Sequence, residues 1–185
     1  MSSEQVIEVH GVRILRVIGG AVAVIVLAVV VVLIMGALQP RNHTASATVV
    51  VNAPQAVVWQ RIEDVQTQPN WRSGLTAVKM LPSQDGHTCW EETSSFGKMP
   101  LCEVLAAAPS TRIVRIADPN LPYGGLWTYE LSPDLSPTNP NATILKITEN
   151  GFTNGWFFRF VGHYIFHEDT QIKKYEADLQ KSIGK

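Results

Sequence analysis

Residues 17–38 read VIGGAVAVIVLAVVVVLIMGAL, a run from Val17 to Leu38 that contains no charged side chain. A helix rises about 1.5 Å per residue, so this run reaches roughly 33 Å, which is enough to cross the hydrocarbon core of a bilayer. Apolar residues cover every face of such a helix, which argues against a helix half-buried in a soluble core. Secretory signal peptides have shorter apolar regions of about 7–15 residues. We therefore predict an uncleaved transmembrane helix.

The charges that flank this run predict its orientation. Arg13 and Arg16 precede it closely, whereas Arg41 alone follows it closely. Positive residues are enriched on the cytoplasmic side of membrane helices, so two against one favours a cytoplasmic N-terminus. We expect a single-pass membrane protein whose C-terminal domain lies outside the cytoplasm.

The membrane helix divides the chain into four predicted parts. Residues 1–16 form a short N-terminal tail and residues 17–38 the membrane helix. Pro40 cannot extend a helix and marks its end. Residues 39–47 then form a linker that spans at most about 30 Å, so the domain at 48–185 stays close to the bilayer. A domain of that size can bury a substantial core.

Composition and motifs exclude several functions for this domain. The formal net charge is −1, which offers no basic field for nucleic acid. The sequence contains no phosphate-binding loop, no GxSxG, no HExxH and no dinucleotide fingerprint. Cys89 and Cys102 are the two cysteines, and their spacing does not match a zinc or redox CxxC motif. We expect no cofactor and no metal.

The domain begins with a strand and a short helix. Residues 48–51 are a β-branched run typical of a strand. Pro54 suits a first helical position. In the helix after it, Val58, Ile62 and Val65 share one face at intervals of four and three residues. That face should pack against the rest of the domain.

Six further strands are predicted, with short turns between most of them. They cover residues 75–81, 88–94, 99–107, 111–117, 126–131 and 143–149. Closely spaced strands of this kind are typical of an antiparallel meander.

The C-terminal part predicts one long amphipathic helix. Asn154 is a plausible N-cap. Seven apolar residues fall on a single helical face, namely Phe158, Val161, Ile165, Ile172, Tyr175, Leu179 and Ile183. This face needs a sheet to lie on, so the domain belongs to the α+β class, with a curved sheet around the helix and a cavity between them.

Several short motifs, in order along residues 46–184, resemble the START-like or SRPBCC superfamily in its polyketide cyclase/dehydrase-like branch. They are Asn52-Ala53-Pro54, Val58-Trp59 with Asp64, Pro69-Asn70-Trp71, the segment GLWTYEL at 125–131, Thr148-Glu149-Asn150-Gly151 and Phe158-Arg159-Phe160. The resemblance implies a helix-grip fold with a hydrophobic ligand cavity. It does not imply one activity, since related folds host different functions.

Strand alternation predicts which side chains face the cavity. Trp127, Tyr129 and Leu131 share one face of their strand, and Glu149 shares the apolar face of the next one with Ile147. A carboxylate there would bind a ligand hydroxyl or act as an acid or base, unless it only makes a structural hydrogen bond. The residues expected to line the cavity are Trp71, Trp90, Leu101, Trp127, Tyr129, Glu149, Val161 and Ile165.

Three functions are consistent with this sequence. The first is a membrane-anchored domain that binds or carries a hydrophobic small molecule, of lipid or polyketide type. The second is a cyclase or dehydratase, for which the sequence offers Glu149 with Tyr129 or Arg115 as an acid/base pair. The third is a non-catalytic interaction module whose cavity is filled by its own side chains.

The two cysteines are predicted to face each other across a hairpin. With a four-residue loop at 94–97, Thr93 pairs with Lys98, and counting outward brings Cys89 opposite Cys102. Directly opposed Cβ atoms lie close to bridging distance. A disulfide is expected in an oxidising compartment, and two free buried thiols in a reducing one.

The last helix carries two further features with competing interpretations. His163 and His167 have the spacing of metal ligands, but no third ligand is evident, so we interpret them as solvated. Trp156, Phe160 and Tyr164 fall on the outer side of the helix. They either contact the membrane interface or pack beneath a loop because the helix begins later than predicted.

Overall fold

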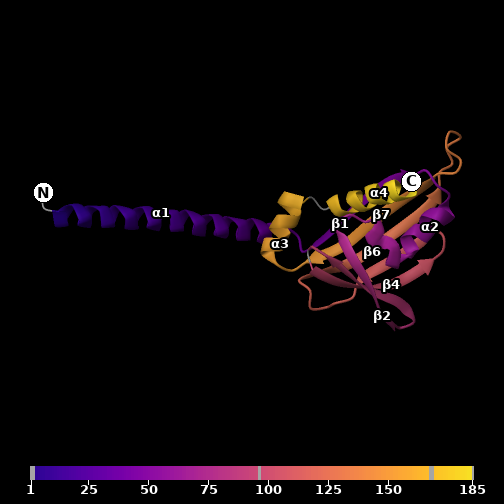
Figure 1. The fold of residues 1–185 in the computed structure, drawn as a ribbon, viewed down its shortest axis with the longest axis horizontal. Helices are drawn as coiled ribbons and strands as arrows, with labels where there is room; N and C mark the ends of the chain where they lie inside the picture. Colours follow the sequence, from indigo (N-terminus) through magenta and orange to yellow (C-terminus); the bar gives the residue numbers. More distant parts are fainter. Residues whose placement is uncertain (1–2, 96, 167–168, 185) are drawn as a thin grey trace.

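The computed structural model describes residues 3–95, 97–166 and 169–184. A long helix, α1 (Ser3–Leu38), projects from one end of a sheet domain (Figure 1). It ends just before Pro40, as predicted. Its segment Arg16–Leu38 has a mean hydropathy of 3.3 and is not buried by the rest of the protein. By length and composition this segment is sufficient to cross a membrane.

The domain is built on one antiparallel sheet of seven strands in the order β1-β7-β6-β5-β4-β3-β2. The strands are β1 (Asn42–Val51), β2 (Leu75–Gln84), β3 (His87–Ser94), β4 (Gly97–Ala107), β5 (Thr111–Ile116), β6 (Tyr123–Pro133) and β7 (Thr143–Thr153). The first strand therefore joins the last one, and β2 to β7 form the predicted meander. The predicted α+β fold is confirmed.

The first strand begins earlier than predicted. β1 starts at Asn42, where its ladder with β7 opens on the pair Asn42↔Phe152, and it continues to Val51↔Thr143. The prediction began at residue 48 because the preceding residues are polar, but β7 also runs on to Thr153 and provides partners for them. Only residues 39–41 connect α1 to the sheet, in place of the predicted linker at 39–47.

Two short helices cover part of the inner face of the sheet. They are α2 (Gln55–Glu63) and the 3₁₀ helix η1 (Val65–Asn70). Val58, Ile62 and Val65 are buried, as their spacing predicts.

The predicted single C-terminal helix is wrong. The structure has a short helix α3 (Trp156–Val161), a π-helical turn η2 (Gly162–Phe166) and a separate helix α4 (Thr170–Ile183). Gly155, rather than Asn154, occupies the N-cap position of α3. α3 lies beside the end of α1 (Figure 1).

Helix α4 is the element that the sheet grips. Ile172, Tyr175 and Leu179 are buried against the sheet, as predicted. The Asp178 carboxylate accepts hydrogen bonds from Ser73 N at 2.7 Å and Oγ at 2.6 Å. Gln180 Nε2 donates to the Val50 carbonyl oxygen at 2.8 Å on the other side. These contacts join α4 to both edges of the groove in which it lies.

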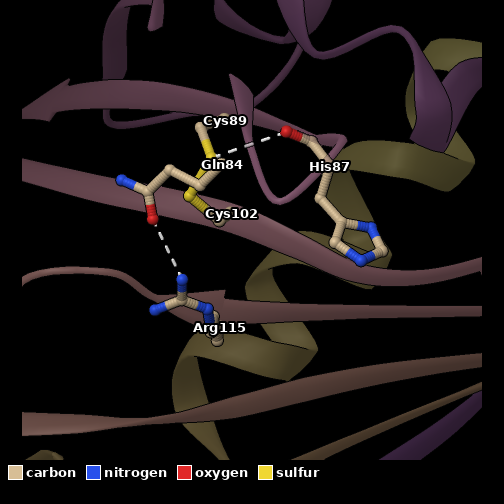
Figure 2. The surroundings of a disulfide bond; sticks show 5 residues. All are labelled: Gln84, His87, Cys89, Cys102 and Arg115. Atoms are coloured by element: carbon tan, nitrogen blue, oxygen red, sulfur yellow. Dashed lines mark hydrogen bonds between the residues drawn. A yellow bond between two sulfur atoms is a disulfide. The ribbon is translucent and has the colours of Figure 1, made fainter. Parts of the chain in front are cut away.

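The two cysteines form a disulfide on the hairpin of β3 and β4, with Cys89 directly opposite Cys102 (Figure 2). The predicted register is confirmed, including the pair Thr93↔Lys98. Both cysteines are 1% exposed. Arg115, the neighbour of Cys102 on β5, donates to Gln84 Oε1 at 3.0 Å beside the disulfide.

Candidate functional site

Four aromatic rings form a continuous run between α4 and the sheet. Trp71, which follows η1, meets Tyr175 of α4 edge-on with ring centroids 5.4 Å apart. Tyr175 lies 5.6 Å from Tyr129 of β6, and Tyr129 lies 6.4 Å from Trp127 on the same strand. Because Trp127 and Tyr129 are two residues apart on β6, both point inward, as predicted.

The run contains two polar atoms that the protein leaves without a partner. Tyr175 Oη and Trp71 Nε1 are buried, and neither has a hydrogen-bond partner among the residues that the structure describes. Buried polar groups normally have such a partner, so an isolated donor at this depth calls for water or a ligand. Burial raises the pKa of Tyr175 well above its usual value and that of Tyr129 to about 12. Both phenols therefore remain protonated near neutral pH and can donate hydrogen bonds.

An ion pair lies beside the aromatic run. Arg72 Nη1 lies 2.6 Å from Glu92 Oε1, and the Glu92 side chain is only 7% exposed. Trp90 Nε1 also donates to Glu92 Oε1, at 3.3 Å. The Arg72 guanidinium lies over the Tyr175 ring at 5.1 Å from its centroid. Charge and aromatic faces are thus combined, a cation–π arrangement that also fixes the orientation of the Tyr175 ring.

A second arginine, Arg112, lies next to Trp90 and links strands β4 and β5 to helix α2. Arg112 is 3% exposed and donates to Glu103 Oε1 at 2.8 Å and to the Ile62 carbonyl oxygen at 2.6 Å. Its guanidinium lies over the Trp90 ring at 5.2 Å. These groups satisfy one another and hold Trp90 in place. Among the described residues, the buried side-chain atoms without a hydrogen-bond partner are Trp71 Nε1, Tyr175 Oη, Thr148 Oγ1 and Glu176 Oε1, and the first two belong to the aromatic run.

Glu149 marks the end of the site nearest α1. It stands opposite Trp127 on one side and Ala45 on the other, so the three form one row across β6, β7 and β1. Its Oε1 lies 3.6 Å from His43 Nε2, and its side chain is 21% exposed. Next to this row is an open groove of about 750 Å³ between the edge of the sheet and the start of α4. The groove is lined by Thr44, Ala45, Ser46, His163, Asp169, Thr170 and Lys173.

The structure brings most of the predicted site residues together. Trp71, Trp90, Leu101, Trp127 and Tyr129 belong to the hydrophobic core or pack against it, and Glu149 lies at its rim. Ile165 is 58% exposed, so the prediction that it faces the sheet is wrong. Val161 is half-buried at the end of α3, a helix that lies mainly against α1.

Other predicted residues are separated from the site. Arg115 faces the disulfide side of the sheet, opposite Cys102, so it cannot pair with Tyr129 as the enzyme hypothesis required. His163 lies in η2 and is exposed, whereas His167 lies outside the described residues. The expected pair of metal ligands therefore has no described geometry.

Sequence analysis missed Arg72, Glu92 and Tyr175 as members of the site. Glu92 could have been found, because it lies two residues from Trp90 on the same strand and must share its face. Tyr175 was placed correctly on the apolar side of its helix but was not assigned to the site. Arg72 follows η1 in the loop before β2, where no periodicity predicts the direction of a side chain.

Residues 42–170 match the sequence family described as polyketide cyclase / dehydrase and lipid transport. This chain belongs to that family. The match covers the sheet with α2, η1, α3 and η2, and it ends at Thr170, the first residue of α4. No curated protein sequence matches the chain.

Solved structures show the same fold as this family member. An aromatase/cyclase, Zhui of Streptomyces sp. R1128, has a TM-score of 0.62 at 13% identity over 77% of this chain and 94% of that one. Norcoclaurine synthase of Thalictrum flavum has a TM-score of 0.59 at 11% identity, over 79% and 96% of the two chains. A START superfamily protein of Mycobacterium smegmatis has a TM-score of 0.57 at 10% identity, over 77% and 97%. At these identities the likeness establishes the helix-grip fold alone.

Proposed function

We propose that this protein is a membrane-anchored binding or carrier domain for a hydrophobic small molecule held between α4 and the sheet. One observation carries the proposal, namely the buried aromatic run with its two isolated donors, Tyr175 Oη and Trp71 Nε1. Ring faces stabilise an apolar molecule, and a few convergent polar atoms fix its orientation. Membership of a family that includes lipid transport is consistent with such a ligand.

The chemistry of the site limits what the ligand can be. Trp71 Nε1 can only donate, whereas Tyr175 Oη can donate or accept, so the ligand needs at least one hydrogen-bond acceptor such as a carbonyl, ether or phenolate oxygen. The rings of Trp71, Tyr175, Tyr129 and Trp127 favour a flat or unsaturated body over a bulky branched one. Glu149 and His43 at the rim would bind a polar end of the molecule.

Native mass spectrometry of the full chain, extracted from its own membrane, tests this proposal directly. We expect an additional mass that dissociates on collision and corresponds to an apolar compound with at least one oxygen. A protein that carries no such mass after gentle extraction, and that binds no hydrophobic fluorescent probe, would instead be an interaction module with a filled interior.

Two matched substitutions locate the ligand. Trp71→Phe removes an isolated N–H group, whereas Trp59→Phe removes one that donates to Glu63 Oε2 at 2.9 Å. Loss of one hydrogen bond of about 1 kcal/mol should lower ligand affinity about five-fold in Trp71→Phe and leave affinity unchanged in Trp59→Phe. Equal affinities in the two variants would contradict the proposed site.

Tyr175→Phe separates ligand binding from folding. Removal of a buried hydroxyl without a partner costs no intramolecular hydrogen bond, so the melting temperature of the ligand-free protein should not fall. Ligand affinity should nevertheless fall by a similar factor. A lower melting temperature with unchanged affinity would assign Tyr175 to the core only.

The proposal places α1 across the membrane and the domain outside the cytoplasm. The length and apolar character of Arg16–Leu38 support the anchor, and the flanking arginines support the orientation. The Cys89–Cys102 disulfide supports an oxidising compartment. Alkylation of the unreduced protein in intact cells should detect no free thiol, and external protease should digest the domain. Two free thiols, or full protection from protease, would reverse the orientation.

A further inference from the structure

Helix α3 lies against the last turns of α1. Phe157 lines a hollow together with Ala28, Val29, Val32 and Leu33 of α1. Gly36 allows the close approach, because a Cβ at that position would overlap the Trp156 carbonyl oxygen. Figure 1 shows α3 at the junction where α1 meets the sheet domain.

Much of the aromatic surface of α3 is exposed, on the side of Phe157 that faces α1 as well as on the sides away from it. Trp156, Phe157 and Phe158 are 54%, 53% and 52% exposed, and Ile165 in the next turn is 58% exposed. Aromatic side chains of this size are normally buried in a soluble protein, and a contiguous exposed group marks a surface that contacts protein or lipid.

The side chain of Arg159 anchors α3 to backbone carbonyl groups of neighbouring segments. Its guanidinium donates to the carbonyl oxygens of Thr153 at 2.9 Å, Gln39 at 3.1 Å and Asn154 at 3.1 Å. Gln39 Nε2 also donates to Tyr164 Oη at 2.9 Å. The positive charge of α3 is therefore directed toward the end of α1 and of β7, and the aromatic side of α3 carries no charge.

The position of Phe157 along α1 sets its depth in a membrane. Leu33 and Ala28 are five and ten residues before the end of α1 at Leu38. At about 1.5 Å per residue they lie roughly 7 to 15 Å from that end. When α1 crosses the bilayer, a side chain beside these residues lies within the hydrocarbon of the nearer leaflet, and Trp156 beside Gly36 lies near its boundary, where tryptophan is enriched.

We propose that α3 and η2 form a membrane-inserted wedge, with lipid acyl chains as the partner of Trp156, Phe157 and Phe158. The inference rests on the membrane anchoring proposed above, and it adds a second contact with the same leaflet. The groove beside Glu149 begins at His163 of η2. The wedge therefore places the opening of the groove at the lipid surface, so that a hydrophobic ligand can enter from the leaflet without crossing bulk water.

Quenching of tryptophan fluorescence by brominated lipid tests the wedge. The full chain is reconstituted in phosphatidylcholine vesicles, with or without bromine on the acyl chains. The chain contains five tryptophans. We expect bromine to quench part of the fluorescence, and Trp156→Phe to abolish most of that quenching. Trp59→Phe, which removes a tryptophan that is 5% exposed, should leave it unchanged.

A second pair of variants tests the position of α3 on α1. Gly36→Leu introduces a side chain where the Trp156 backbone lies, whereas Gly20→Leu introduces one where nothing lies within 4 Å of a Cβ. We expect Gly36→Leu to displace Trp156 and shift its quenching toward bromines nearer the headgroup. Gly20→Leu should behave as the wild type.

Two results would overturn the wedge, and they differ in meaning. In the first, carbonate washing leaves the chain in the vesicles while bromine quenches Trp156→Phe as strongly as the wild type. In that case α3 lies in water, and the membrane anchor is supported without the wedge. If carbonate washing releases the chain, the anchor and the wedge are both wrong. Ligand binding by the extracted protein is measured separately and depends on neither result.

Discussion

The protein contains two groups of aromatic side chains. Both include tryptophan, but one group is buried and the other is exposed. Trp71, Trp90 and Tyr175 lie inside the grip, where arginine guanidinium groups cover two of the rings. Trp156 and Phe157 lie on α3, where more than half of each side chain is exposed. In the interior group, Tyr175 and Trp90 contact charged side chains, whereas the α3 group lies beside an apolar helix. The neighbours of an aromatic residue, rather than its type, determine whether it belongs to a core or to a lipid-facing surface.

The largest expected effect is a difference in the free energy of unfolding when a tryptophan of each group is replaced by alanine. Trp90→Ala removes a side chain that is 2% exposed and should lower the free energy of unfolding by about 3–5 kcal/mol. Trp156→Ala removes one that is 54% exposed and should cost about 1 kcal/mol or less. Urea unfolding of the full chain in detergent, followed by circular dichroism, measures both. Similar losses in the two variants would mean that α3 is part of the core.

A smaller effect tests the polar support of the interior group. Glu92→Gln leaves the Arg72 guanidinium without its carboxylate partner and should lower the free energy of unfolding by about 3 kcal/mol. Glu130→Gln is the matched control, since Glu130 and Lys146 are 51% and 52% exposed and such a pair contributes about 1 kcal/mol or less. A loss of under 1 kcal/mol in Glu92→Gln would show that the packing of Trp90 and Tyr175 does not depend on the ion pair.

The smallest effect concerns pH. Glu176 of α4 is 5% exposed, and burial raises the pKa of its carboxyl to about 7, although Lys173 acts in the opposite direction. The folded protein thus holds a proton that the unfolded chain releases near its ordinary value of 4.5. Stability should therefore fall as pH rises between these two values, by about 1–3 kcal/mol.

Glu176→Gln should remove this dependence, which urea unfolding at a series of pH values detects. The residual slope of the variant then comes from other groups. A slope that is the same in Glu176→Gln and in the wild type would assign the pH dependence elsewhere in the domain.

Local rules were sufficient to predict the sheet. Strand alternation placed Trp127 and Tyr129 on the inner face, because a side-chain period of two leaves only one choice once the apolar face is known. Counting from a short hairpin loop brought Cys89 opposite Cys102, since the register of a hairpin follows from its loop length.

Periodicity was not sufficient to predict the C-terminal region. Phe158 and Ile165 continue the helical spacing of Ile172 and Leu179, yet they are exposed while the latter two are buried. A hydrophobic stripe indicates that a face needs an apolar partner, but it does not say which one. Here the first part of the stripe stays exposed beside α1, and the second part packs on the sheet.

The polar interior could not be predicted from pattern alone. Alternation places the adjacent residues Glu91 and Glu92 on opposite faces of β3, but it does not identify their partners. Glu91 pairs with the exposed Lys98, whereas Glu92 pairs with Arg72 inside the domain. The partner of Glu92 comes from a loop twenty residues earlier. Contacts of this kind depend on tertiary structure and have no local signal.

The short connection at 39–41 bears on the carrier function proposed above. Arg159 and the Gln39 carbonyl, together with Thr153 N and the Arg41 carbonyl at 2.9 Å, join the end of α1 to the sheet. Three residues reach only about 10 Å, so the grip cannot swing across an aqueous gap toward another membrane. The carrier that we propose would therefore remain beside the bilayer that its own α1 crosses, and would serve that bilayer alone.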